Sequence, residues 1–121
     1  MLLRIDSSTH DDTSVLAVSG EIDIDTVDLL RSAVTDALQA GVRDLIIDLN
    51  QVTYLDSAGL GMLVGTYKRL TAEEGSLTVR CCVPRILRLF TITRLTDLLR
   101  IDRTPPTDDV VTEDRIHQVT V

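Results

Sequence analysis

The feature that most restricts the fold is the apolar run DLIIDL, residues 44–49, because a helical pattern lies on each side of it. Before the run, apolar residues recur at helical spacing from Asp25, which we expect to cap the helix, until Gly41 ends the pattern. After the run, a second helical pattern continues to about Gly75. A short continuous apolar run is typical of a central strand that is covered on both faces. Strands that are joined through helices imply a largely parallel sheet.

Segments in which apolar and polar residues alternate supply the other expected strands. Residues 2–5 and 14–22 flank a polar turn and predict an amino-terminal hairpin, while residues 76–83 predict a strand after the second helix. Pro84 suits the first turn of a third helix. The predicted fold class is therefore α/β: a single domain over residues 1–103, with a mixed, largely parallel sheet, an amino-terminal hairpin and helices packed on the sheet.

The composition argues against several classes of function. A net charge of -7 disfavours binding to nucleic acid, and an aromatic content of 2% leaves few surfaces on which bases could stack. No apolar stretch approaches the roughly 18 residues that span a bilayer, so we expect a cytoplasmic protein that contacts no membrane. The two cysteines, Cys81 and Cys82, are adjacent and are expected to be buried free thiols. We predict no metal site and no cofactor.

The carboxyl-terminal residues differ in composition from the rest of the chain. From Thr104 to the end, prolines interrupt regular structure and acidic residues favour solvation. We therefore predict that residues 104–121 form an acidic and largely mobile tail. Within it, the alternating sequence RIHQVTV, residues 115–121, predicts a weak edge strand.

The second helix contains three glycines in its first three turns, although an interior glycine costs about 1 kcal/mol relative to alanine. Helical geometry predicts that one side packs on the sheet, and that side consists of Leu60, Leu63, Val64, Tyr67 and Leu70. The opposite side then carries Ala58, Gly61, Met62, Gly65 and Arg69. Small residues let another backbone approach closely, and methionine offers an adaptable apolar contact. This outward stripe therefore predicts a docking surface.

Ser57 lies where the loop after the central strand turns into the second helix, and two interpretations of it are open. As a serine at a helix start, it is expected to act as the N-cap. Alternatively, its hydroxyl accepts a phosphate, which would add about -1.5 to -2 charges at the positive end of the helix dipole. In the second case the surface changes sign without disrupting the fold.

Three motifs in this order resemble those of the STAS-domain family, and within it those of the bacterial anti-sigma factor antagonists. The most specific is LDSAGLGML, residues 55–63, which matches the family signature after the central strand. GEID, residues 20–23, resembles the turn before the first helix, and PRILRLF, residues 84–90, is similar to the start of the third helix. The resemblance extends over roughly residues 2–101.

This resemblance implies a protein interaction that is controlled by phosphorylation. In such systems the unphosphorylated antagonist binds an anti-sigma factor with serine kinase activity, which frees a sigma factor, and a PP2C-like phosphatase reverses the modification. Ser57 matches the phosphoacceptor position. The residues expected to bind the partner are Gly20, Glu21, Asp23, Asp56, Ser57, Ala58, Gly59, Gly61, Met62, Gly65 and Arg69.

The sequence departs from the family pattern at two positions. Ala58 replaces a serine or threonine that often follows the acceptor, so Ser57 is the only hydroxyl at the tip of the loop. Arg94 stands where many relatives end the third helix with glycine. We do not expect an enzyme, because His10 and His117 lie in a polar turn and in the tail, and DSAGLG lacks the G-x-S-x-G motif.

One alternative function stays within the same fold. A STAS domain can also act as a subunit of a signalling or transport complex that binds a fixed partner without a phosphorylation cycle. In that case Ser57 would serve only as the cap of the helix.

Overall fold

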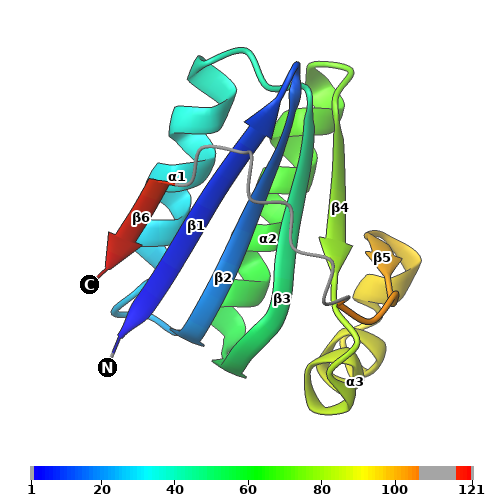
Figure 1. Cartoon of the computed structure of the whole chain (residues 1–121). Coiled ribbons are helices and arrows are strands. Elements are labelled where there is room, and N and C mark those ends of the chain that lie inside the picture. The colour runs from blue at the N-terminus through cyan, green and yellow to red at the C-terminus, as the bar shows by residue number, and fades with distance from the viewer. Residues whose placement is uncertain (1, 107–116, 121) are drawn as a thin grey trace.

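The computed structural model describes residues 2–106 and 117–120, which form one six-stranded sheet with helices packed on it (Figure 1). The strands are β1 (Leu3–His10), β2 (Thr13–Ile22), β3 (Asp44–Leu55), β4 (Ser76–Arg80), β5 (Arg100–Asp102) and β6 (His117–Thr120). The helices are α1 (Val27–Gln39), α2 (Ser57–Ala72) and α3 (Pro84–Ile92), and a short 3₁₀ turn, η1, spans Leu95–Asp97.

The sheet is mixed, with the strand order β5-β4-β3-β2-β1-β6. β1 pairs in antiparallel fashion with both β2 and β6. The pairs β2–β3, β3–β4 and β4–β5 are parallel, and each is connected through a helical crossover. The predicted fold class, with its amino-terminal hairpin, is therefore confirmed.

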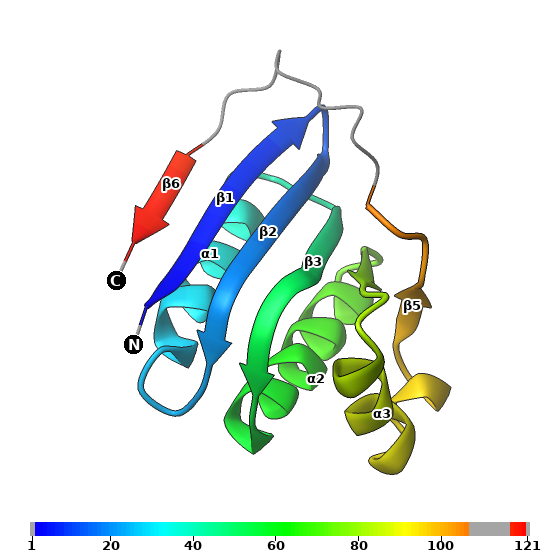
Figure 2. The same ribbon diagram turned by 60° about the horizontal axis from the view of Figure 1, so that its bottom comes forward.

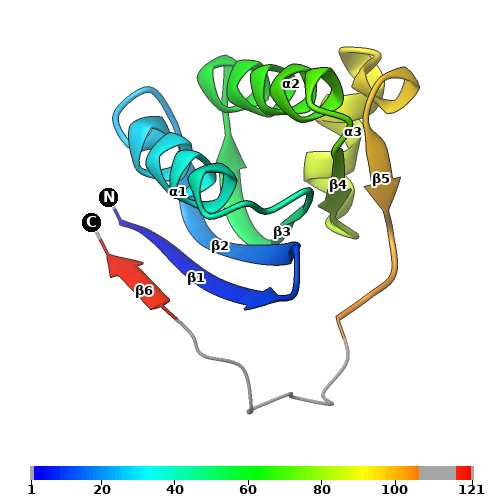
Figure 3. The same cartoon turned by 90° about the horizontal axis from the view of Figure 1, so that it is seen from above.

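Both α1 and α2 lie on the same face of the sheet (Figure 3). In β3, Leu45, Ile47 and Leu49 are fully buried, whereas Ile46 and Asp48, which point to the other face, are only half-buried. The prediction that this strand is covered on both faces is thus wrong. Its continuous apolar run arises because Ile46 adds an apolar residue to the less covered face, so the run does not report two helical layers.

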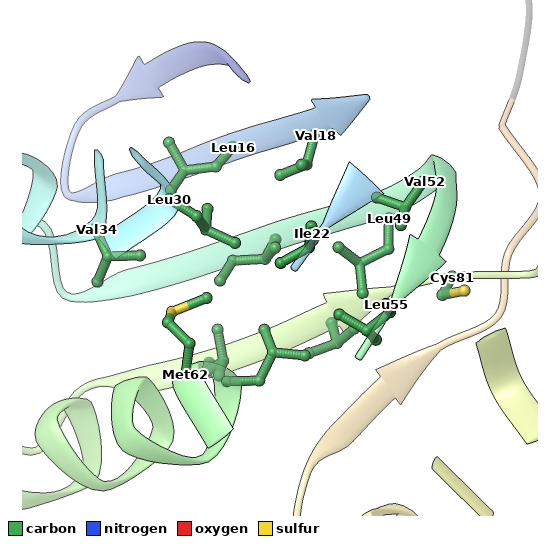
Figure 4. Close-up of a cluster of buried hydrophobic side chains, with 14 of the residues drawn as sticks. Leu16, Val18, Ile22, Leu30, Val34, Leu49, Val52, Leu55, Met62 and Cys81 are labelled. Atoms are coloured by element: carbon green, nitrogen blue, oxygen red, sulfur yellow. The ribbon is translucent and has the colours of Figure 1, made fainter. Parts of the chain in front are cut away.

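The core lies between the sheet and the two helices (Figure 4). Among the core residues that Figure 4 labels are Leu16, Val18 and Ile22 of β2 and Leu30 and Val34 of α1. Burying an aliphatic side chain of this size contributes about 1.5–3 kcal/mol relative to leaving it exposed. This packing fixes the start of α1 beside the start of α2, where the candidate site lies.

The start of α1 differs from the prediction. Thr26, not Asp25, is the N-cap residue, and its side chain makes no capping hydrogen bond to the helix. Instead, the carboxylate of Asp23 accepts hydrogen bonds from the backbone amides of Asp25 at 2.9 Å and Thr26 at 3.0 Å. Asp23 can do this because an aspartate readily binds backbone amides two or three residues ahead. At the other end, Gly41 has a φ of +93°, as expected for a glycine that ends a helix.

After α2 the chain also departs from the prediction. β4 ends at Arg80, three residues earlier than expected, and β5 was not predicted. Arg80 lies between two carboxylates, 3.8 Å from Asp48 and 3.6 Å from Asp102, and so links β3, β4 and β5. The pKa of Asp102 is lowered mainly by hydrogen bonds from Thr104, with a smaller contribution from Arg80.

The end of α3 and the tail bear on two more expectations. Arg94, which follows α3, adopts the left-handed conformation with a φ of +62°, a conformation that glycine usually provides at the end of a helix. β6 matches part of the edge strand predicted for residues 115–121 and pairs with residues 4–7 of β1. The mobility predicted for the tail concerns mainly residues 107–116, which lie outside the described residues.

Candidate functional site

The start of α2 is capped by Asp56, and the prediction that Ser57 is the cap is wrong. β3 continues to Leu55, and Asp56 follows in an extended conformation. The Asp56 carboxylate accepts hydrogen bonds from the amides of Ala58 at 2.9 Å and Gly59 at 3.1 Å. Aspartate caps helices as well as serine does, and here it comes one residue earlier in the chain. The cap therefore leaves the hydroxyl of Ser57 unused.

Ser57 is the first residue of α2, and its side chain is exposed. Within residues 2–106 and 117–120, no side chain or backbone group forms a hydrogen bond with its hydroxyl. The amino terminus of a helix carries a partial positive charge of roughly half an elementary charge. The hydroxyl is thus both accessible and placed where a negative charge is tolerated.

The three glycines of α2 lie in two different environments. Gly59 is buried, and a Cβ atom there would overlap side-chain atoms of Leu55 and Ile22. Gly59 therefore lets the helix approach the sheet and is not an accessible contact residue, contrary to prediction. A Cβ atom on Gly61 or Gly65 would meet open space, and both residues are exposed.

The prediction that Met62 belongs to an exposed stripe of α2 is wrong. Only 6% of Met62 is exposed, and Figure 4 shows its side chain directed toward Leu30 and Val34 of α1. The hydroxyl of Thr66, one turn later, is buried and donates to the backbone oxygen of Met62 at 2.9 Å. Because α1 packs beside α2, the buried face of α2 is turned toward α1 as well as toward the sheet.

The same orientation of α2 decides which of the other predicted helix residues are buried and which are exposed. Of the residues predicted to face the sheet, Leu63 and Leu70 are buried, whereas Leu60, Val64 and Tyr67 are half-buried. On the outward side, Gly61, Gly65 and Arg69 are exposed and Ala58 is half-buried.

A groove of about 640 Å³ runs between α1 and α2, and Ser57 lies at one end of it. Gly61, Gly65 and Arg69 line its α2 side, while Met62 and Thr66 contribute to its floor. The α1 side is formed by Ile24, Val27, Asp28, Arg31 and Val34. None of the residues on this α1 side was predicted from the sequence. The signal that could have revealed it is Ile24, an apolar residue in a turn, of which 72% is exposed.

The turn at residues 20–23 lies against the Ser57 loop, although none of the predicted residues in it lines the groove. The Ile22 backbone oxygen accepts a hydrogen bond from the Asp56 amide at 3.2 Å, and Glu21 lies opposite Tyr54 in the sheet. Gly20 is required here because its φ is +106° and a Cβ atom would overlap the backbone oxygen of Leu2. Tyr54, of which 50% is exposed, is a further surface residue that was not predicted.

The remaining candidate groups lie elsewhere. Cys81 and Cys82 are free thiols, as predicted, but only Cys81 is buried, and this burial raises the pKa of its thiol. The ring of His10 lies 3.6 Å from Asp11 in the β1–β2 turn. Within the described residues, no cluster of side chains is suited to hold a metal ion. None of the helices in that part of the chain has the length and apolar character that crossing a membrane requires.

Comparisons with known proteins identify relatives over most of the chain. The STAS domain matches residues 4–107. The anti-sigma-B factor antagonist of Staphylococcus aureus is 40% identical over 102 residues, which cover 84% of this chain and 94% of that protein.

Solved structures show the same fold. An anti-sigma factor antagonist from Mycobacterium paratuberculosis superposes with a TM-score of 0.77 and 33% identity, covering 84% of this chain and 86% of that one. Bacillus SpoIIAA in its phosphorylated form has a TM-score of 0.66 at 21% identity, covering 87% and 93% of the two chains. The chain therefore belongs to the STAS-domain family, in its group of anti-sigma factor antagonists.

Proposed function

We propose that this protein is an anti-sigma factor antagonist whose binding to its partner is switched by phosphorylation of Ser57. The observation that carries the proposal is the exposed hydroxyl of Ser57, which the Asp56 cap leaves unused at the mouth of the groove between α1 and α2. The partner is an anti-sigma factor with serine kinase activity, and a PP2C-like phosphatase removes the phosphate. The protein acts as substrate and ligand, and the kinase supplies the catalytic groups.

In the unphosphorylated state, the partner lies over Ser57 and the exposed glycines of α2. Gly61 and Gly65 have no side chains, so a backbone segment of the partner can approach the helix closely. Ile24 on the opposite rim provides an exposed apolar contact. The relatives are named for antagonism of anti-sigma factors, which agrees with this kind of interface.

Phosphorylation forms a bond between the Ser57 oxygen and the γ-phosphorus of ATP and breaks the bond from that phosphorus to the bridging oxygen, so ADP leaves. The hydroxyl proton passes to the kinase or to water. No strong base on this chain is needed, because enzymatic phosphoryl transfer depends mainly on positioning and charge stabilisation. The Asp56 carboxylate has another task, since it holds the amides of Ala58 and Gly59.

The phosphate then weakens the complex without unfolding the antagonist. The helix amino terminus tolerates the added charge, whereas the same charge sits beside Asp56 and faces the remaining phosphates of the nucleotide. A hundredfold loss of affinity requires about 2.7 kcal/mol. Like charges that are brought together in an interface can provide this amount.

The test is a binding experiment with two variants of one residue. Ser57→Ala and Ser57→Asp are used as baits in lysate of the native host, and bound proteins are identified by mass spectrometry. We expect Ser57→Ala to retain an ATP-binding serine kinase that Ser57→Asp does not retain, and we expect the purified kinase to phosphorylate the wild-type chain but not Ser57→Ala. Equal retention of the same proteins by both baits would contradict the switch and favour the alternative, a STAS subunit that binds a fixed partner.

A further inference from the structure

Basic residues are concentrated in one part of this acidic protein. The chain has 12 Lys and Arg against 19 Asp and Glu, yet residues 84–103 contain five arginines and only two acids, Asp97 and Asp102. The five arginines are Arg85, Arg88, Arg94, Arg100 and Arg103, and all are exposed. The region of α3, η1 and β5 therefore carries a local positive charge against a negative background.

Two of these arginines share one face of α3. Ile86 and Phe90 bury the opposite face in the core. Arg85 and Arg88 are three residues apart and are neighbours on the helix surface, and Ile92, of which 69% is exposed, follows one turn later. Arg88 forms no ion pair or side-chain hydrogen bond with any residue that the structure describes. Arginine is enriched in protein interfaces relative to the rest of the protein surface.

This face of α3 begins next to the last part of β3, the strand that leads into the Ser57 loop. The guanidinium of Arg85 donates a hydrogen bond to the backbone oxygen of Thr53 at 3.0 Å, four residues before Ser57 in the chain. β4 has ended by this point, and the hydrogen bond from Arg85 joins the start of α3 to the last part of β3. Figure 2 shows the start of α2 and α3 at the same end of the molecule. A partner that covers Ser57 and Tyr54 would meet α3 next.

We propose that the arginine face of α3, formed by Arg85 and Arg88, is a second contact region for the anti-sigma factor kinase and binds acidic side chains of that partner. The inference rests on the proposed function of Ser57. A guanidinium presents several donors in a fixed plane and binds a carboxylate through two parallel hydrogen bonds. Arg85 uses one donor on Thr53 and keeps others for the partner.

Carboxylates fit this region better than the phosphates of a nucleic acid. The one aromatic residue between residues 84 and 103 is Phe90, which is buried, so the region offers no surface for stacking bases. The remainder of the chain is strongly acidic and repels a phosphate backbone. Acidic groups of a protein partner would instead be steered to this one positive region, which raises the association rate.

The experiment compares two charge reversals on exposed helical positions. Arg88→Glu changes the α3 face, whereas Lys68→Glu makes the same change of charge on α2 at a residue that does not line the groove. The probe is the serine kinase retained by the Ser57→Ala bait, and its association and dissociation rates are measured at low and at physiological salt. Thermal unfolding of both variants checks that the fold is intact.

We expect Arg88→Glu to slow association at least about tenfold at low salt, with a smaller effect at higher salt, and Lys68→Glu to change it by no more than about twofold. Arg88→Gln is expected to lie between wild type and Arg88→Glu. If Arg88→Glu and Lys68→Glu associated with the kinase at equal rates, and Ser57→Asp still abolished binding, this inference alone would be wrong. If Ser57→Asp bound as wild type does, the proposed function itself would fail, so the two failures are distinguishable.

Discussion

The carboxylate of Asp56 accepts a hydrogen bond from the amide of Gly59 at 3.1 Å, and this contact closes the start of α2 around Ser57 without involving its hydroxyl. The residue that stabilises the helix and the residue proposed to be modified are therefore neighbours with separate tasks. A substitution at one position should leave the task of the other largely intact.

We predict that Asp56→Ala lowers the free energy of unfolding by about 1 kcal/mol, because two amides lose their acceptor. Ser57→Ala should change it by no more than about 0.5 kcal/mol, since Ser57 is exposed and does not cap the helix. Urea denaturation of both variants measures the difference, with Asp56→Asn as a control that keeps an oxygen acceptor. A larger loss for Ser57→Ala than for Asp56→Ala would show that the cap is assigned to the wrong residue.

The glycines of α2 should respond in opposite directions to alanine. Gly59→Ala is expected to destabilise the fold by roughly 1–3 kcal/mol, because its Cβ would overlap Leu55 and Ile22. Gly61→Ala is expected to stabilise it by up to about 1 kcal/mol, because the new methyl group meets open space and alanine favours the helix. Thermal denaturation of the two variants tests this, and a change of the same sign in both would refute it.

A larger side chain in the groove should separate binding from stability. Gly65→Gln fills part of the groove, about two helical turns after Ser57 on the exposed side of α2, and we expect it to weaken kinase binding at least about tenfold while the fold remains stable. Thr71→Gln, on an exposed part of the same helix outside the groove, is the matched control and should bind as wild type does. Titration of each variant with the kinase gives the dissociation constants. Undiminished binding of Gly65→Gln would place the interface elsewhere.

The two adjacent cysteines should differ in reactivity. Burial raises the pKa of Cys81 above its ordinary value of 9.0, so in the native protein we expect a disulfide reagent to react with Cys82 and to reach Cys81 only after unfolding. Because the folded-state pKa is the higher one, this thiol's contribution to stability is complete below about pH 9 and declines as the pH rises further. Cys81→Ala should remove that decline, which urea titrations at pH 8 and 10 would measure. If both thiols reacted with the reagent at the same rate in the native protein, the burial of Cys81 would be contradicted.

Arg94 is the position where glycine should improve the fold. Its φ of +62° is disfavoured for a residue with a Cβ, and its ion pair with Asp97 is exposed, so Arg94→Gly is expected to raise the free energy of unfolding by about 1 kcal/mol. Arg88→Gly, inside α3, serves as the control and should lower it by about the same amount. If Arg94→Gly destabilised the protein, the arginine side chain would contribute more to the free energy of unfolding than its left-handed backbone conformation costs.

Local patterns were sufficient to predict the long elements and their order. Alternation in β2 and helical spacing in α1 each reflect burial on one side, which a single sequence records directly. β5 could not be predicted in this way, because three residues are too few to show a period and its pairing with β4 is a long-range contact.

The errors at the site have physical causes of the same kind. Asp56 and Ser57 are adjacent and are equally good caps, so only the point at which β3 ends decides between them. Met62 was placed on the outside because the sequence of α2 does not show that α1 packs against its flank. The α1 side of the groove was missed for the same reason, because the sequence of one helix does not show which residues of a neighbouring helix lie beside it.

The two edges of the sheet have a consequence for how this protein meets others. β5 is only three residues long, and β6 pairs with residues 4–7 of the eight-residue β1. Long, flat edge strands are templates on which further strands add, and short or covered edges prevent such growth. Both edges of the described sheet are therefore short, which disfavours growth by backbone pairing between copies of the protein.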